Sequence, residues 1–363
     1  MAFTLKNILS SFQGVTATEK KRDIVGIDIG TSSVKVVEIE QFETTIRLKT
    51  YGELQLGPYV SAPLGSAVRL PVEARTKAIV DILRESNVES KQGVMTLPLA
   101  DSFVTTISLV AQEREDIGPR VHVEARKHIP VPLSEVELEW VEVEPLANTP
   151  KSVREVLLAV IQKSAIAESK SILSSISMTS QQPEIELFSA LRAATKETDT
   201  SVAVIDLGAQ TSKLYISEGG FLRRIHRVRV GGASATDRIA SSLAVSFEEA
   251  ENQKRNARPD TQYFADIKKV MVATYEKPMQ EFKRVIDQYE IRSGTALSRI
   301  VIMGGGVSFY DFSSFVSYAL DRKVEKANPF TKIAYPAFME DALTEIAPVF
   351  GVALGAALRP FEQ

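Results

Sequence analysis

The 363-residue chain contains no cysteine. This absence excludes disulfides, iron–sulfur clusters and thiolate zinc sites, and it suits a reducing cytoplasm. Histidine is scarce as well: there are three, and the two nearest, His122 and His128, are not spaced to share a helix face. We therefore predict no catalytic or metal-binding histidine. The net charge of -3 provides no general attraction to nucleic acid or to an anionic membrane.

Long apolar runs are also missing. No uninterrupted apolar stretch reaches the length of about 18 residues that spans a bilayer, and the N-terminus lacks the apolar core of a secretory signal. Leu5, Ile8, Leu9 and Phe12 do fall at helical spacing. We expect residues 1–22 to form an N-terminal arm packed on the body; the alternative is a peptide that docks on a membrane surface or a neighbouring protein.

The composition that remains is that of an ordinary globular protein, with 44% hydrophobic and 25% charged residues. The length favours two or more domains, each with its own core. Apolar alternation and turn residues predict that the first segment runs as three strands, a loop, a helix and a strand. These elements cover residues 24–29, 34–40, 44–54, 59–70, 72–85 and 93–97.

An inserted unit follows, from about residue 103 to 180, whose strands and helices alternate as in a compact α+β module. A second core begins at residue 202 with three strands and continues with helices. Ser246 and Glu249 form a capping-box sequence that should begin one of these helices. Pro278 should interrupt or kink the long helix predicted for residues 267–292. The predicted elements are strands at 104–109, 136–143, 154–161, 202–205, 213–216, 221–230 and 299–303, and helices at 116–128, 165–177, 236–245 and 347–358.

One short motif occurs twice, each time between two predicted strands. Residues 28–35 (DIGTSSVK) and 206–213 (DLGAQTSK) share aspartate, glycine, hydroxyl and lysine at the same offsets. A charge at the end of an apolar strand is costly to bury, and a divalent cation would offset that cost. Glycine and hydroxyls allow the turn to present N–H and O–H donors to phosphate. The candidate phosphate-binding residues are Asp28, Gly30, Thr31, Ser32, Ser33, Lys35, Asp206, Gly208, Gln210, Thr211 and Lys213, with Asp28 and Asp206 as candidate Mg2+ ligands.

Further candidates lie in the second half. A glycine cluster, Gly304 to Gly306, directly follows the strand at 299–303 and could approach a base or ribose closely; the alternative is a simple strand-to-helix turn. Glu251 and Lys254 share a helix face and could bond ribose or base; the alternative is a solvated ion pair. Gly231 and Gly232 would form a tight turn. The candidate nucleoside-side residues are Gly231, Gly232, Glu251, Lys254, Gly304, Gly305 and Gly306.

These pieces in this order resemble the actin-like ATPase superfamily, an α/β, ribonuclease-H-like two-domain fold. Residues 28–35 and 206–213 look like its two phosphate loops, Gly304 to Gly306 its adenosine loop, and residues 347–358 its second connecting helix. The resemblance implies a first domain at 23–200 carrying the module, a second domain at 201–343, and a C-terminal helix at 344–363 that returns to the first domain. ATP and Mg2+ are the implied ligands.

The inserted module is similar to that of the FtsA/PilM group. Residues 124–136 (EARKHIPVPLSEV), 250–254 (AENQK), 328–330 (NPF) and 3–9 resemble PilM patterns, whereas Ala209 and residues 59–70 depart from them. The resemblance implies a cytoplasmic, ATP-binding scaffold of type IV pilus assembly. Its implied partners are the N-terminal cytoplasmic peptide of a PilN-like inner-membrane protein, held in a groove beside the module, and the pilus motor ATPases. Contact with the membrane would be indirect. The resemblance leaves open whether the chain forms a homo-oligomer.

Two other functions remain as alternatives. A small-molecule kinase of the same superfamily would need a general base in the cleft; Asp101 is the nearest candidate, and a turn residue is the simpler interpretation. An FtsA-like filament-forming cell-division protein would polymerise with ATP. We predict no catalytic residue for the scaffold, whose enzymatic activity would be at most weak ATP hydrolysis.

Overall fold

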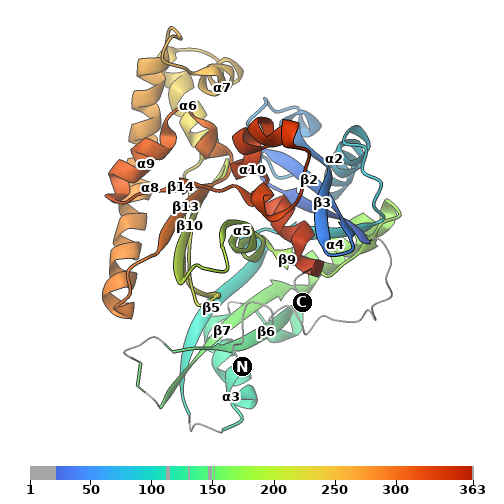
Figure 1. Cartoon of the computed structure of the whole chain (residues 1–363), viewed down its shortest axis with the longest axis vertical. Coiled ribbons are helices and arrows are strands. Elements are labelled where there is room, and N and C mark those ends of the chain that lie inside the picture. Colours follow the sequence, from blue (N-terminus) through green and yellow to red (C-terminus); the bar gives the residue numbers. More distant parts are fainter. Residues whose placement is uncertain (1–21, 112–114, 130, 146–148, 151, 362–363) are drawn as a thin grey trace.

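The computed structural model describes residues 22–111, 115–129, 131–145, 149–150 and 152–361. The predicted N-terminal arm therefore lies outside the described residues, apart from Arg22. Two sheets stand side by side with two helices between them, and a smaller sheet lies at one end of the molecule (Figure 1). Each large sheet belongs to one half of the chain, as the repeated motif predicts.

The first sheet has the strand order β3-β2-β1-β4-β8, with β9 also paired to β4. β1 is antiparallel to β2 and parallel to β4, and β2 is antiparallel to β3. Apolar side chains of β1 and β2 alternate between the two faces, so that one face packs on α2 and α4 and the other on α10. The elements are β1 Arg22–Ile29, β2 Ser33–Phe42, β3 Thr45–Gln55, α2 Val72–Glu85, β4 Gln92–Leu97, α4 Lys163–Ser175, β8 Thr179–Ser180 and β9 Glu184–Ile185.

The second sheet repeats this arrangement, with the order β12-β11-β10-β13-β14. β10 is antiparallel to β11 and parallel to β13, as β1 is to β2 and β4. One face packs on α6, α8 and α9, and the other on α5. The elements are α5 Glu186–Ala194, β10 Ser201–Leu207, β11 Ser212–Glu218, β12 Phe221–Val228, α6 Gly232–Leu243, α7 Phe247–Asn256, α8 Phe264–Ser293, β13 Arg299–Met303, α9 Phe312–Leu320, β14 Glu325–Lys326 and α10 Glu340–Leu358.

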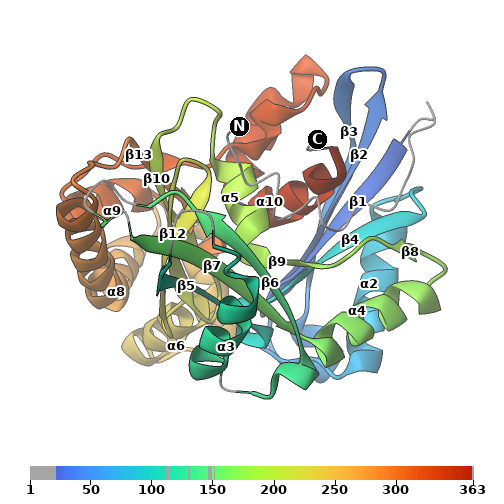
Figure 2. The ribbon, with the colours of Figure 1, turned by 90° about the horizontal axis from the view of Figure 1, so that it is seen from below.

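The inserted module is a three-stranded antiparallel sheet, β5-β7-β6, covered by α3 (Figure 2). Its elements are β5 Ser102–Val110, α3 Gly118–His128, β6 Val136–Val143 and β7 Val153–Gln162. α4 packs into the core of the first sheet, where Ile172 and Leu173 meet Val25 and Ile27. On this packing we propose that the module proper ends at β7 and that α4 belongs to the first domain.

α5 and α10 cross between the two large sheets at backbone contact. A Cβ on Gly355 would stand 2.0 Å from the carbonyl oxygen of Ser189, and one on Gly26 would stand 2.0 Å from that of Ala353. Only glycine permits such an approach. The stretch Ala337–Phe361, which contains α10, is long and apolar enough by composition to cross a membrane. Two thirds of its most apolar window is buried in the protein, which is typical of a core helix.

Most predicted elements are confirmed, and four predictions need correction. The predictions missed α5 altogether. α6 begins at Gly232 rather than at Thr236, so Gly231 caps the helix instead of preceding it. Of the interruption or kink predicted at Pro278, the interruption is wrong: α8 continues through Pro278, because its packed apolar face stabilises the helix beyond the local cost of proline. α10 begins seven residues before residue 347, at Glu340.

Candidate functional site

The two repeated turns have the same backbone geometry. The Gly30 N–H donates to the carbonyl of Ser33, and the Gly208 N–H donates to the carbonyl of Thr211, both at 3.0 Å. In the strand registers Asp28 stands opposite Lys35, as Asp206 stands opposite Lys213. The offsets that recur in the sequence therefore recur in space. Thr31, Ser32, Thr211 and Gln210 lie at the turns with part of their surface exposed, while Ser33 is buried.

The carboxylate of the second turn has a cation bonded to it. Lys213 Nζ lies 3.2 Å from Asp206 Oδ2 and 2.8 Å from Glu186 Oε2. Burial raises the pKa of Asp206, with Lys213 opposing and Glu186 reinforcing the shift. The pKa of Lys213 is raised well above its ordinary value: burial acts to lower it, and the neighbouring Glu186 and Asp206 outweigh burial. The three groups form a buried cluster with one positive and two negative charges.

The carboxylate of the first turn is paired differently. Asp28 Oδ1 accepts from the Thr96 hydroxyl at 3.2 Å. Lys35 Nζ is instead 2.7 Å from Ser33 Oγ and 3.6 Å from Glu53. Burial raises the pKa of Asp28 from 3.8 to about 6; Lys35 and Lys213 lower it, and Glu186 and Asp206 raise it further. Because the charges of the second turn act on Asp28, the two turns share one electrostatic environment.

Glu186, like Thr96, is a residue of the candidate site that the sequence analysis did not predict. It is the first residue of α5, and its Oε1 accepts from the Leu99 N–H at 2.7 Å while its Oε2 pairs with Lys213. This carboxylate links a first-domain loop to the second phosphate turn. The apolar spacing of Leu187 and Leu191, both buried, would have revealed the helix. Nothing local in the sequence would have placed its first residue beside Asp206.

The glycine cluster after β13 packs on the second turn. Gly304 has a φ of +90°, and a Cβ there would stand 2.6 Å from Asp206 Oδ1 and 2.6 Å from the carbonyl oxygen of Leu207. Glycine is therefore required at this position. A Cβ on Gly306 would stand 2.9 Å from the Cβ of Leu207, whereas Gly305 has nothing within 4 Å. The predicted adenosine loop thus lies beside the predicted phosphate loop.

The paired glycines at 231–232 also adjoin this turn. A Cβ on Gly231 would stand 2.5 Å from the carbonyl oxygen of Gly208. The Gly232 N–H donates to the same carbonyl at 3.0 Å. The N-terminus of α6 is therefore fastened to the second turn, and its positive dipole end lies near the anion expected there.

Glu251 and Lys254 on α7 form an ion pair that is largely buried rather than solvated. Lys254 Nζ is 2.6 Å from Glu251 Oε2, which also accepts from the Thr236 hydroxyl at 2.6 Å. Lys254 also donates to the Gly232 carbonyl at 3.0 Å. For Glu251, burial would raise the pKa, but Lys254 and the Thr236 hydroxyl hold it below its ordinary value. The pair therefore connects α7 with the start of α6 and, through Gly232, with the second turn.

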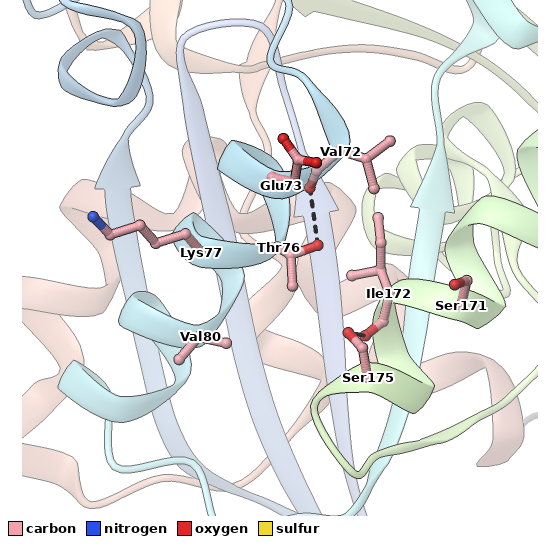
Figure 3. Close-up of a pocket in the computed structure, with 8 residues that line it drawn as sticks. All are labelled: Val72, Glu73, Thr76, Lys77, Val80, Ser171, Ile172 and Ser175. Carbon is pink, nitrogen blue, oxygen red and sulfur yellow. Dashed lines mark hydrogen bonds between the residues drawn. The ribbon is translucent and has the colours of Figure 1, made fainter.

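Among the residues that the structure describes, no three carboxylates or histidines are close enough together to hold a metal ion. Asp28 and Asp206 thus remain candidate Mg2+ ligands only in company with ligand oxygens. Two hollows lie away from the turns. One, of about 510 Å³, is bounded by α2 and α4 and lined by Val72, Val80 and Ile172 (Figure 3). The other, of about 350 Å³, lies where the module meets the start of α4.

Comparison with known proteins identifies the family. The family model for the type IV pilus assembly protein PilM matches residues 26–361. This chain belongs to the PilM family. The family match covers both phosphate turns, the inserted module and both connecting helices, so the resemblance read from the sequence is confirmed for the family and for its pilus assembly role.

Solved structures confirm the actin-like fold. A structure described as a PilM-PilN type IV pilus biogenesis complex has 24% identity and a TM-score of 0.75, covering 93% of this chain and 98% of that chain. MreB5 of Spiroplasma citri bound to ADP has 11% identity and a TM-score of 0.54, covering 94% and 97%. The ethanolamine utilization protein EutJ from Carboxydothermus hydrogenoformans has 17% identity and a TM-score of 0.53, covering 97% and 96%.

Proposed function

We propose that this PilM-family chain is a cytoplasmic scaffold that binds ATP with Mg2+ and captures the N-terminal peptide of a PilN-like inner-membrane protein. The observation that carries the nucleotide proposal is the pair of matched turns that act on one another electrostatically. Asp28 is buried, and within the part of the chain that the structure describes its carboxylate bonds to the Thr96 hydroxyl and forms no ion pair, which is a costly way to bury a charge. A divalent cation brought by a polyphosphate would offset that cost.

The residues present fit such a ligand. Gly304 leaves no room for a side chain beside Asp206, and α6 directs its N-terminus to the second turn. In this proposal the hydroxyls and backbone N–H groups at Thr31, Ser33, Gly208 and Thr211 hold phosphate oxygens. Asp28 and Asp206 orient Mg2+, and Glu251 and Lys254 hold the nucleoside. The ADP-bound state of MreB5, a protein of the same fold, is consistent with this assignment.

Calorimetry of the purified chain with Mg2+ and ATP tests the nucleotide proposal. We expect saturable binding that weakens when Mg2+ is chelated. Without the cation, the carboxylates of Asp28 and Asp206 would lie unneutralised beside the phosphates. A chain that binds no ATP with Mg2+ would contradict the proposal. Thermal unfolding is a second measurement, since a ligand that binds the folded state alone raises the midpoint.

For the peptide we propose the hollow at the junction of the module with α4. Val131, Ser134 and Glu135 line it from the module side, and Gln162 and Lys163 line it from the end of β7 and the start of α4. This position beside the module agrees with the groove that the resemblance implies. The structure described as a PilM-PilN complex supports the choice of partner.

A matched pair of variants tests this site. Val131→Glu places a charge in the proposed peptide hollow, whereas Val80→Glu places the same charge in the hollow at α2 and α4. We expect Val131→Glu to weaken binding of a synthetic PilN-like N-terminal peptide, and Val80→Glu to leave it unchanged. Fluorescence anisotropy with labelled peptide measures both. Equal affinity of the two variants would move the site elsewhere, and no binding by the unaltered chain would refute the partner.

A further inference from the structure

Residues 55–68, which we call the strap, connect β3 with the approach to α2 and lie largely in the stretch where the sequence departs from the family pattern. The strap is fastened to the first phosphate turn near both of its ends. The Leu56 N–H donates to the Ser32 carbonyl, and the Val68 N–H donates to the Thr31 carbonyl, each at 2.8 Å. The strap and the first turn must therefore move together.

The strap is also stiff and held to its own domain. Within it the Ala62 N–H donates to the Gly57 carbonyl at 2.9 Å, and the Ser66 N–H donates to that of Pro63 at 3.2 Å. Its two prolines, at 58 and 63, limit the backbone further. The Tyr59 hydroxyl donates to Asp81 of α2 at 2.6 Å. These contacts make the strap a rigid extension of the first domain.

The far side of the strap touches α7 of the second domain. Gln55 Oε1 accepts from the Gly65 N–H at 3.2 Å and from Arg255 Nη2 at 3.3 Å. Gly65 has a φ of +81°, and a Cβ there would stand 2.4 Å from the carboxyl carbon of Glu251. Arg255 also donates from Nε to Glu251 Oε1 at 2.7 Å. The strap backbone thus lies directly against the carboxylate assigned to the nucleoside.

We propose that the strap is a gate over the nucleoside end of the site and that the contact of Gln55 and Gly65 with α7 is its latch. This inference rests on the proposed nucleotide site. The hydrogen bonds that join the strap to the first domain are 2.6 to 2.8 Å long, whereas the bond from Arg255 of α7 to Gln55 is 3.3 Å long and exposed. When the domains separate, the contact with α7 breaks first. Nucleotide leaves by this opening, so the latch sets the release rate.

Stopped-flow release of a fluorescent ATP analogue tests the latch. Gln55→Ala and Arg255→Ala each remove one side of the hydrogen bond, and we expect release about three- to tenfold faster, from the ordinary range of such a bond. Association should change less, because the phosphate turns remain intact. Lys283→Ala is the matched control: it removes a half-buried cation that pairs with Asp287 on α8, in the same domain, and should leave release unchanged.

A glycine pair provides a test that removes no hydrogen-bonding side chain. Gly65 and Gly219 both have positive φ, but a Cβ on Gly219 meets nothing within 4 Å. Both alanine variants bear the same kind of backbone strain, and only Gly65→Ala pushes the strap from Glu251. We expect faster release from Gly65→Ala alone.

The outcomes separate the two proposals. A wild-type chain that binds no nucleotide refutes the nucleotide site and the gate with it. A wild-type chain that binds nucleotide, with release unchanged in Gln55→Ala, Arg255→Ala and Gly65→Ala, refutes the gate alone. Equally faster nucleotide release from Gly65→Ala and Gly219→Ala also counts against the latch, because backbone strain alone, without a contact to Glu251, would then be enough to speed release. Unfolding midpoints of each variant establish that the fold is retained.

Discussion

The two phosphate turns are alike in backbone and unlike in their ion pairs. Each begins with an aspartate at a strand end and is closed by a glycine N–H bond of 3.0 Å. Lys213 pairs with Asp206 and Glu186, whereas Lys35 turns to Ser33 and Glu53 and leaves Asp28 to a threonine hydroxyl. A repeat in sequence therefore predicts a repeat in chain path, while the pairing of charges depends on what each half packs against.

This difference assigns different work to the two halves. The second turn is electrostatically organised before any ligand arrives, since its lysine lies between two carboxylates. The first turn has a buried carboxylate, Asp28, whose pKa is raised to about 6 and which bonds to a threonine hydroxyl. Under the proposed function, the first turn is therefore where a ligand cation would have most to offset, and the second turn would be the template that holds the phosphates.

The largest expected effect comes from removing each lysine in turn. Lys213→Met leaves Asp206 and Glu186 buried without their cation, and breaking a buried pair costs about 3–5 kcal/mol. Lys35→Met removes a looser pair with the partly exposed Glu53, which is worth about 1 kcal/mol or less. Urea unfolding of both variants measures the two free energies. Equal losses would show that the turns are electrostatically equivalent after all.

The next effect concerns the glycines after β13. Gly304→Ala adds strain at a φ of +90° and a clash with Asp206 and Leu207, and we expect a loss of about 2–4 kcal/mol. Gly305→Ala meets nothing within 4 Å and should change the unfolding free energy by less than about 0.5 kcal/mol. The same urea experiment compares them. A loss of unfolding free energy in Gly304→Ala as small as that in Gly305→Ala would mean that the second turn is more adaptable than its packing indicates.

Neutralising the two aspartates separately should change the stability of the ligand-free chain by smaller amounts and in opposite directions. Asp28→Asn removes a buried charge whose hydrogen-bond partner is the Thr96 hydroxyl, so the ligand-free chain should gain about 1 kcal/mol of stability. Asp206→Asn removes a charge bonded to Lys213 and should cost about 1–2 kcal/mol. Both should bind ATP with Mg2+ more weakly under the proposed function. Unfolding without ligand measures the stability of each variant, and unfolding with Mg2+ and ATP measures how strongly each variant binds the ligand. A loss of stability in ligand-free Asp28→Asn would contradict the comparison.

Much of the fold follows from local pattern. Alternating apolar residues predicted the longer strands of both large sheets but not the two-residue strands β8, β9 and β14. The predicted bounds of Val72–Glu85 and Val136–Val143 agree with the structure. The cap at Ser246 is also confirmed, since its side chain accepts from the Glu249 N–H. These features could be predicted because each is determined by a few neighbouring residues.

The misses have long-range causes. α5 has helical apolar spacing at Leu187 and Leu191, but its polar residues Ser189 and Arg192 are buried as well, and only the packing between the two sheets explains their burial. The continuity of α8 through Pro278 is determined by tertiary packing. Glu186 and Thr96 reach the turns from other elements of the chain. The motif predicted where the site lies, and only the packed structure shows which side chains complete it. The roles of the candidate residues remain predictions.

The smallest expected effect is a change in the pH dependence of stability, for which a third buried carboxylate, Glu184, is the reference. Burial would raise the pKa of Glu184, but Arg192 outweighs burial: it donates to both carboxylate oxygens, at 2.7 and 2.8 Å, and with Arg359 and the Ser189 hydroxyl it holds the pKa below the ordinary 4.5. Between the lowered pKa of Glu184 in the folded chain and its ordinary value of 4.5, the folded chain then binds fewer protons than the unfolded chain. The stability from Glu184 is therefore complete above pH 4.5 and is lost as the pH falls through the lowered pKa.

Urea unfolding between pH 7 and pH 3 measures this dependence, with Glu184→Gln as the control. The variant loses the bonds of the charged group to Arg192 and should be less stable at neutral pH. Its stability should also decline less steeply on acidification, because one group that takes up a proton on unfolding has been removed. If the free energy of unfolding falls as steeply with decreasing pH in Glu184→Gln as in the wild type, Glu184 is not held ionised in the folded chain. The contrast with the raised pKa values of Asp28 and Asp206 would then lose its reference, since the carboxylate that accepts from an arginine at both oxygens would behave like the two whose pKa burial raises.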